Sequence, residues 1–313
     1  MTVLRGRIRP VLRWVVAVSL IGLVFFTVDT ALLWREMARL SPVVFFSALA
    51  VTVVQVMVSA WRWRYTVSRL GLSLPYGLAV REYYLATFLN QVLPGGVLGD
   101  VNRAWRHSAD SGQRLAALHG VAIERLSGQL VLAMAVVFAV VWLASNGHVL
   151  AVPFDRLWLL IIVLVAVIAG LFLVSRLSGR LADYLGQLRR DLRRSLLGWP
   201  ALPVQLSSSL LLLASYLAAF LVLAQGAGYV HSVASLFLIT ALSVLLLLSM
   251  VIPVTVAGWG VREGVAALLW PLAGLPSEQG VALSVSYGVL VFVSGLPGLL
   301  VLLRGVKQRQ PAQ

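Results

Sequence analysis

The chain of 313 residues has no cysteine, one lysine (Lys307) and few charged residues of either sign, 12% in all. Without cysteine it has no disulfide, no thiolate metal site and no cysteine nucleophile. Its four histidines show no metal-ligand spacing, and no Gly-x-x-x-x-Gly-Lys-[Ser/Thr] nucleotide-binding motif occurs. A soluble globular domain carries about 25% charged residues. These shortages exclude a water-soluble enzyme with one apolar core, and we expect neither a metal nor a cofactor.

Apolar residues are abundant instead: the chain is 60% hydrophobic, with a mean hydropathy of +0.94. Long apolar runs separated by charged residues predict an all-α polytopic membrane protein. Six runs are long enough to be full spans, at about residues 14–33, 43–60, 119–144, 157–175, 205–224 and 281–303. Two other stretches, 75–118 and 233–280, are apolar but interrupted by proline, glycine and charged residues. We interpret these two as broken hairpins.

The net charge of +14 comes from 25 basic residues, which lie between the apolar runs and not on one soluble face. This spacing argues against nucleic acid as a partner. Sixteen of the basic residues, among them Arg62, Arg64 and Arg69, fall in loops that we assign to the cytoplasm, and three fall in outside loops. By the positive-inside rule both termini are then cytoplasmic, as expected for a protein of the bacterial inner membrane.

The segment 176–204 carries leucines at helical spacing with arginines between them. This pattern predicts a basic amphipathic helix that lies on the cytoplasmic face of the membrane. A solvated cytoplasmic linker helix is the alternative interpretation.

The two broken stretches resemble each other. Residues 92–103 read VLPGGVLGDVNR, and residues 251–262 read VIPVTVAGWGVR. Three matched pairs are each 159 residues apart: Pro94 with Pro253, Gly99 with Gly258, and Arg103 with Arg262. The predicted helices on either side of the breaks are offset by 162 residues. We therefore expect one integral membrane domain over residues 1–313, built from two repeats.

Each repeat has the order helix, helix, broken hairpin, helix, over about 14–145 and 157–304, with a short external loop between them. The charge assignment makes the first hairpin enter from the cytoplasm and the second from outside, which is an inverted repeat. Interrupted segments at corresponding positions of inverted halves indicate the binding site of a transporter.

Proline and glycine free backbone polar groups, which must face protein or water because hydrocarbon cannot bind them. A helix that restarts after a break also points the positive end of its dipole at the cavity, which suits an anion. The residues that we expect at the breaks and around their cavity are Pro94, Gly95, Gly96, Gly99, Pro253, Gly258, Trp259 and Gly260.

Charged residues follow both breaks. An ionisable side chain inside the membrane costs about 2.5–3.5 kcal/mol on insertion scales, so each needs a partner or a function. We expect Arg103 and Arg262 to clamp a phosphate from two sides, because guanidinium is a bidentate, permanently charged donor. The other residues of this predicted substrate site are Asp100, Glu124, Arg125 and Glu263. Its carboxylates would orient the arginines or carry protons; purely structural ion pairs are the alternative.

Glu124 and Arg125 are adjacent and point about 100° apart on a helix, so each is expected to have its partner elsewhere. His107 and His119 are expected to be interfacial polar residues and not proton relays. No residue is assigned a catalytic role.

Several of these residues fall into short motifs: Pro94-Gly95-Gly96, Gly99-Asp100, Arg103, Glu124-Arg125-Leu126 and Gly258-Trp259-Gly260-Val261-Arg262-Glu263-Gly264. These motifs resemble the signature of the lysylphosphatidylglycerol synthase transmembrane family, whose best-known member supplies the membrane half of the multiple peptide resistance factor. The resemblance covers roughly residues 10–305. It implies a domain that moves aminoacylated phosphatidylglycerol between leaflets.

The 313 residues hold no soluble aminoacyl-transferase domain, so the resemblance implies the flippase-like part of such a protein. Its expected partners are membrane lipids and a separately encoded enzyme that synthesises the lipid. Members of the family without the soluble domain are linked to hopanoid and polyprenyl-lipid pathways, so the identity of the lipid does not carry over.

The favoured hypothesis is a lipid flippase for a phosphate-bearing phospholipid or polyprenyl lipid. One alternative is a membrane glycosyltransferase that uses a polyprenyl-phosphate sugar, with Asp100 or Glu124 as the base. The other is a membrane scaffold without transport, in which neutral substitutions of Arg103 and Arg262 change only stability.

Overall fold

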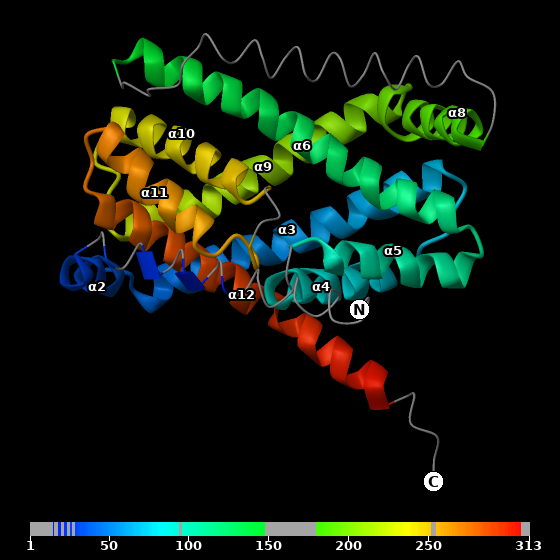
Figure 1. Cartoon of the computed structure of the whole chain (residues 1–313), viewed down its shortest axis with the longest axis horizontal. Coiled ribbons are helices and arrows are strands. Elements are labelled where there is room, and N and C mark those ends of the chain that lie inside the picture. The colour runs from blue at the N-terminus through cyan, green and yellow to red at the C-terminus, as the bar shows by residue number, and fades with distance from the viewer. Residues whose placement is uncertain are drawn as a thin grey trace, which may run out of the picture.

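The computed structural model describes residues 29–93, 96–147, 180–251 and 255–307, together with residues 15, 18, 19, 22, 23 and 26. Helices and short connections make up these ranges, without a strand in any of them (Figure 1). The helices are α2 (Thr30–Ala38), α3 (Pro42–Arg69), α4 (Tyr76–Val92), α5 (Leu98–Ser111), α6 (Arg114–Ser145), α8 (Arg180–Leu192), the π-turn η1 (Arg193–Leu197), α9 (Ala201–Gly226), α10 (Val233–Ser249), α11 (Val261–Leu272) and α12 (Ser277–Lys307).

Four helices, α3, α6, α9 and α12, are long and apolar enough to cross a membrane. The shortest has 26 residues, about 39 Å at 1.5 Å per residue, which exceeds a hydrocarbon core of about 30 Å. They confirm the predicted spans at 43–60, 119–144, 205–224 and 281–303, and with them the prediction of an all-α polytopic membrane protein. The predicted span at 157–175 lies outside the described residues, as does most of the one at 14–33.

The predicted end of the first span at residue 33 is wrong, because a separate helix begins within it. Asp29 has extended backbone angles, and its Oδ1 accepts hydrogen bonds from the backbone N–H groups of Ala31 (2.8 Å) and Leu32 (3.0 Å). A side chain that caps these otherwise unpaired donors fixes a helix start. The helix α2 therefore starts at Thr30.

Two pairs of short helices occupy the stretches that we interpreted as broken hairpins. The pair α4 and α5 has 17 and 14 residues, and the pair α10 and α11 has 17 and 12. Seventeen residues of helix are about 25 Å long, less than the hydrocarbon core. The pairs end at Ser111 and Leu272, earlier than the predicted 118 and 280, because α6 and α12 each begin with a long N-terminal extension of the predicted span.

The helices α3 and α9 lie against each other and run antiparallel. Gln55 Nε2 donates to the backbone oxygen of Ser215 (2.9 Å), and Gln205 Nε2 donates to Thr66 Oγ1 (2.8 Å). Residue numbers therefore rise along α3 as they fall along α9. Since α3 and α9 hold the same place in the two predicted repeats, this pair of corresponding helices has opposite directions.

Two of the other helices pack on helices of the opposite repeat. The helix α4 packs on α12, and its counterpart α10 packs on α6; the α4–α5 and α10–α11 pairs lie toward opposite ends of the molecule (Figure 1). Counterparts have close lengths: 28 and 26, 17 and 17, 14 and 12, 32 and 31 residues. An inverted repeat requires this arrangement. The relation between the complete halves 14–145 and 157–304 stays a prediction.

The predicted amphipathic helix at 176–204 extends too far. The helix α8 and the π-turn η1 end at Leu197, the chain turns through Gly198, and residues 201–204 already belong to α9. Within α8, Arg189 and Arg190 are exposed while Asp191 is buried. The position of this helix on a membrane face stays a prediction.

Gly298 tests the packing of α12 on α4, because a Cβ at this position would overlap the backbone oxygen of Tyr84. We expect Gly298→Ala to lower the free energy of unfolding by about 1–3 kcal/mol, as overpacking does. Gly264→Ala is the matched control, since no atom lies within 4 Å of a Cβ there, and it should be neutral or stabilise the helix by up to about 1 kcal/mol. Thermal unfolding of the purified protein in detergent measures both; equal effects would contradict this packing.

Candidate functional site

Five charged side chains form a continuous chain of ion pairs, which we call the arginine–carboxylate network: Arg62, Glu124, Arg103, Asp100 and Arg125. Glu124 accepts from the Nη2 atoms of Arg62 and Arg103, each at 2.6 Å. Asp100 accepts from Arg103 Nε at 3.0 Å and from Arg125 Nη2 at 2.6 Å. The network joins α3, α5 and α6. The expectation that the neighbours Glu124 and Arg125 have separate partners is confirmed.

The network is buried, and its charges do not cancel. Arg103 and Glu124 are 0% exposed, and Arg62 and Asp100 are 5% and 6% exposed. Only Arg125, with 45% of its side chain exposed, lies at the edge. Three guanidinium groups against two carboxylates leave one positive charge in excess. Because an unbalanced charge inside a bilayer protein is costly, a bound anion would stabilise this arrangement.

Arg103 lies between two aromatic rings. Its guanidinium carbon is 4.7 Å from the ring centroid of Trp63 on α3 and 4.5 Å from that of Tyr83 on α4. Such cation–π contacts involve the face of the guanidinium group and leave its edges for hydrogen bonds. Neither Arg103 Nη1 nor Trp63 Nε1 has a hydrogen-bond partner among the described residues, although both are buried. Arg103 therefore has an unused donor at the centre of the network.

Polar groups of α4 and α9 complete the surroundings. Arg62 Nη1 donates to Ser209 Oγ (2.8 Å), and Asn90 Nδ2 donates to Asp100 Oδ2 (3.0 Å). Asn90 Oδ1 accepts from the backbone N–H of Gly99 (2.7 Å). A Cβ at Gly99 would overlap the backbone oxygen of Ala86, so only glycine lets α5 approach α4 closely enough for these contacts.

The second break carries a smaller cluster around Arg262, which is 1% exposed. Arg262 Nη2 donates to Glu263 Oε1 (2.7 Å), and its Nε donates to Ser284 Oγ (2.7 Å). Glu263 Oε2 accepts from the backbone N–H of Gly260, whose φ of 82° favours glycine. The guanidinium lies 5.2 Å from the Trp259 ring and 5.8 Å from the Tyr287 ring.

The two clusters contain the same kinds of residue at different positions of their helices. The helices α5 and α11 begin at residues 98 and 261, which are 163 residues apart and not 159. Asp100 and Glu263 therefore share the third position of their helices, whereas Arg103 lies one turn further along than Arg262. Each break is thus followed by a carboxylate near the helix start and by an arginine stacked on two aromatic rings.

The two arginines belong to separate clusters. Within the described ranges, no hydrogen bond or ion pair joins the Arg103 network to Arg262. A two-sided clamp on one phosphate therefore stays a prediction.

The remaining predicted cavity residues lie at the breaks. Gly96 and Gly258 have φ values of 62° and 78° and lie in the turns between short helices. Pro94, Gly95 and Pro253 fall outside the described residues. In the part of the chain that the structure describes, no group of histidine and carboxylate side chains is arranged to hold a metal ion.

The assignment of Arg62 to a cytoplasmic loop was wrong. Arg62 lies within α3, and the sequence signal for this was the unbroken helical pattern that continues to Arg69. His107 and His119, which we expected to be interfacial, are both buried within the protein, and their depth in the membrane stays a prediction. His119 is 3% exposed with Nδ1 2.7 Å from Asp191 Oδ2, which ties α6 to α8, and His107 is 6% exposed with its ring against Trp63.

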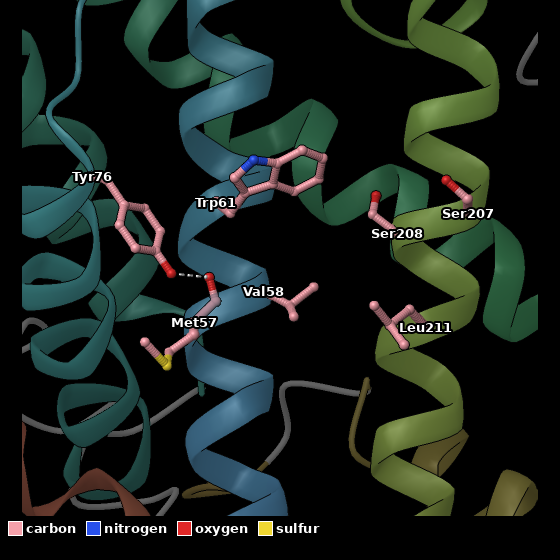
Figure 2. Close-up of a pocket in the computed structure, with 7 residues that line it drawn as sticks. All are labelled: Met57, Val58, Trp61, Tyr76, Ser207, Ser208 and Leu211. Atoms are coloured by element: carbon pink, nitrogen blue, oxygen red, sulfur yellow. Dashed lines mark hydrogen bonds between the residues drawn. The ribbon is translucent and has the colours of Figure 1, made fainter.

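A groove of about 420 Å³ lies beside the network, between α3 and α9 near the start of α4 (Figure 2). Its lining residues are Met57, Val58, Trp61, Tyr76, Ser207, Ser208 and Leu211. Figure 2 shows side chains of α3 and α9 facing each other across it, and Tyr76 Oη donating to the backbone oxygen of Met57 (3.1 Å). Trp61 and Ser208 directly precede the network residue Arg62 and its partner Ser209.

Comparison with known proteins identifies one family. The model of the lysylphosphatidylglycerol synthase TM region matches residues 11–298 of this chain. The matched range includes the whole arginine–carboxylate network, the Arg262 cluster and the groove. No curated protein matches the chain.

Glu124 is the residue on which the network depends. We expect Glu124→Gln to lower the free energy of unfolding by about 3–5 kcal/mol, because it leaves the buried Arg62 guanidinium without a carboxylate and Arg103 with Asp100 alone. Asp183→Asn, at an exposed position of α8, is the control and should change stability little. Unfolding in detergent, followed by circular dichroism, measures both variants.

The double variant Arg62→Gln/Glu124→Gln restores the original charge balance. It should be less destabilised than Glu124→Gln alone, because contacting residues are energetically coupled. A double variant that is as unstable as the sum of the two single variants would contradict the pairing.

Proposed function

Because the chain belongs to the lysylphosphatidylglycerol synthase TM family, and because a cationic network is buried among its membrane-crossing helices, we propose that it moves a phosphate-bearing lipid between leaflets. The single observation that carries the proposal is the excess positive charge around Arg103, whose Nη1 donor is unused. The lipid head group would lie at this network. We place the protein in the cell membrane with both termini in the cytoplasm, next to a separately encoded enzyme that makes the lipid.

A phosphate group fits the network for chemical reasons. It supplies the negative charge that the three guanidinium groups lack, and it accepts several hydrogen bonds from planar donors. Arg103 is held in place, because it is fully buried, is paired with Asp100 and Glu124, and lies 4.7 and 4.5 Å from the Trp63 and Tyr83 ring centroids. A rigid donor loses little conformational freedom on binding. The network would therefore bind a phosphate in place and not follow it through the membrane.

The groove between α3 and α9 supports a lipid as the carrier of that phosphate. It is mostly apolar, and it lies against helices that are long enough to span the bilayer. Hydrocarbon is the solvent on the outside of such helices. A lipid chain in the groove would lie along the segment of α3 that carries Arg62, the residue after the groove-lining Trp61.

Each pair of short helices packs on a long helix of the other repeat: α4 on α12, and α10 on α6. This arrangement supports a movement of one pair against the other. If α4–α5 and α10–α11 enter from opposite faces, as we propose, rocking of one pair against the other opens the site to each leaflet in turn. Each pair is fixed to its surroundings by one buried arginine cluster. A neutral residue in place of Arg103 or Arg262 would therefore abolish selection of the head group when the site is open to one of the two leaflets.

Lipid translocation in proteoliposomes tests the proposal. The lipids are phosphatidylglycerol, aminoacyl-phosphatidylglycerol, a polyprenyl phosphate and a phosphate-free diacyl glycolipid. We expect movement of at least one phosphate-bearing lipid and none of the glycolipid. Arg103→Gln and Arg262→Gln should lower the rate by about tenfold or more, the equivalent of one lost charge-assisted hydrogen bond.

Arg114→Gln is the matched control, because Arg114 is exposed at the start of α6 and lies over the ring of Trp105, outside both arginine clusters. Its rate should equal that of the unchanged protein. Movement of all four lipids at one rate, or wild-type rates in Arg103→Gln that elutes as a folded species, would refute head-group selection by the network.

A further inference from the structure

A second cavity lies at the open end of the α4–α5 pair and is not used by the site described above. It has a volume of about 60 Å³, enough for a few water molecules. Its lining residues are Trp63, Leu74, Leu78, Arg81, Glu82, Arg106 and His107. They come from the end of α3, the loop that follows it, the first turns of α4 and the last turns of α5. The cavity therefore opens at the face where α3 ends.

The charged residues of this cavity also leave an excess of positive charge. Glu82, which is 4% exposed, forms two contacts with Arg106: Oε1 to Nη2 at 2.9 Å and Oε2 to Nε at 2.8 Å. Arg81 is exposed beside this pair. Two guanidinium groups against one carboxylate again favour an anion. Arg106 has 36% of its side chain exposed, so a ligand can reach it from outside.

Trp63 contacts both this cavity and the arginine–carboxylate network. It lines this cavity, and its ring also lies 4.7 Å from the Arg103 guanidinium. Arg103 and His107 are four residues apart on α5, about 6 Å along the helix. The buried indole N–H of Trp63 has no hydrogen-bond partner among the described residues. One aromatic side chain thus contacts both cationic sites.

We propose that this cavity is an outer site for a phosphate group, which it holds with Arg106 and Arg81 before the phosphate passes Trp63 to the Arg103 network. The inference rests on the proposed function and adds a step to it. The phosphate arrives from the face on which α3 ends, the one expected to be cytoplasmic. Trp63 offers its indole N–H to the phosphate as it passes.

The test is the dependence of translocation on the fraction of phosphatidylglycerol in proteoliposomes. Arg106→Gln should raise the half-saturating fraction by about tenfold and leave the rate at saturation unchanged, because it weakens capture and not transfer. Arg103→Gln should instead lower the rate at every fraction. Arg114→Gln, which lies outside both sites, should match the unchanged protein.

Two further variants separate binding from folding. Arg106→Lys keeps a charge beside Glu82 and should recover most of the low half-saturating fraction. Arg81→Gln removes an exposed charge without leaving a buried carboxylate unpaired, and it should raise the half-saturating fraction as well. If Arg81→Gln and Arg106→Gln both behave like Arg114→Gln while the unchanged protein transports, the outer site is wrong and the proposed function stands.

A protein that moves no phosphatidylglycerol, polyprenyl phosphate or aminoacyl lipid would overturn the outer site together with the proposed function.

Competition by inorganic phosphate distinguishes a site for the free phosphate ion from a site for a lipid-bound phosphate. Competition by inorganic phosphate that disappears in Arg106→Gln would mean that the site also binds the free ion. Absence of competition, with the Arg106 effect intact, would mean that it binds only phosphate carried by a lipid.

Discussion

The buried carboxylate of Glu124 is the constraint on which the arrangement of the helices depends. It has no exposed surface and lies 2.6 Å from the guanidinium groups of both Arg62 and Arg103. A carboxylate in this position without partners would cost several kcal/mol. Apolar side chains in a bilayer gain little by moving from lipid to protein, so they do not by themselves decide which helices touch. Ion pairing between α3, α5 and α6 therefore determines where the first hairpin lies, and the close approach at Gly99 permits it.

The same pairing explains why the site suits an anion. Two carboxylates hold three arginines, so the network is stable enough to form but remains one negative charge short. A ligand phosphate would supply that charge, whereas a purely structural network would be expected to balance it. The excess lies among α3, α5 and α6, near a mostly apolar groove between α3 and α9, and a second excess lies about one helical turn further along α5, at Arg81, Glu82 and Arg106. A cationic site thus lies near an apolar groove, which matches the phosphate head group and the hydrocarbon chain of a lipid.

Much of the fold could be predicted from the sequence because it depends on local properties. Apolar runs gave the four long helices, and proline and glycine marked both breaks. The charged residues of the two clusters, Asp100, Arg103, Glu124, Arg125, Arg262 and Glu263, could be singled out because charged residues next to such breaks are rare. Partners could not be predicted, since they come from other helices. Arg62 was misplaced because Arg64 and Arg69 nearby made it look like a loop residue, and the alignment of Arg103 with Arg262 was one turn from the helix register. Glu82, Arg106 and Trp63 gave no sequence signal, because only the packing of α3, α4 and α5 brings them together.

Native mass spectrometry of the purified protein tests the central claim most directly. The protein would be released from detergent after incubation with equal amounts of phosphatidylglycerol and a phosphate-free diacyl glycolipid. The account predicts that the unchanged protein and Arg114→Gln retain phosphatidylglycerol, that neither retains the glycolipid, and that Arg103→Gln retains neither lipid. Equal retention of both lipids, or undiminished phosphatidylglycerol on folded Arg103→Gln, would contradict a phosphate-binding role for the buried network.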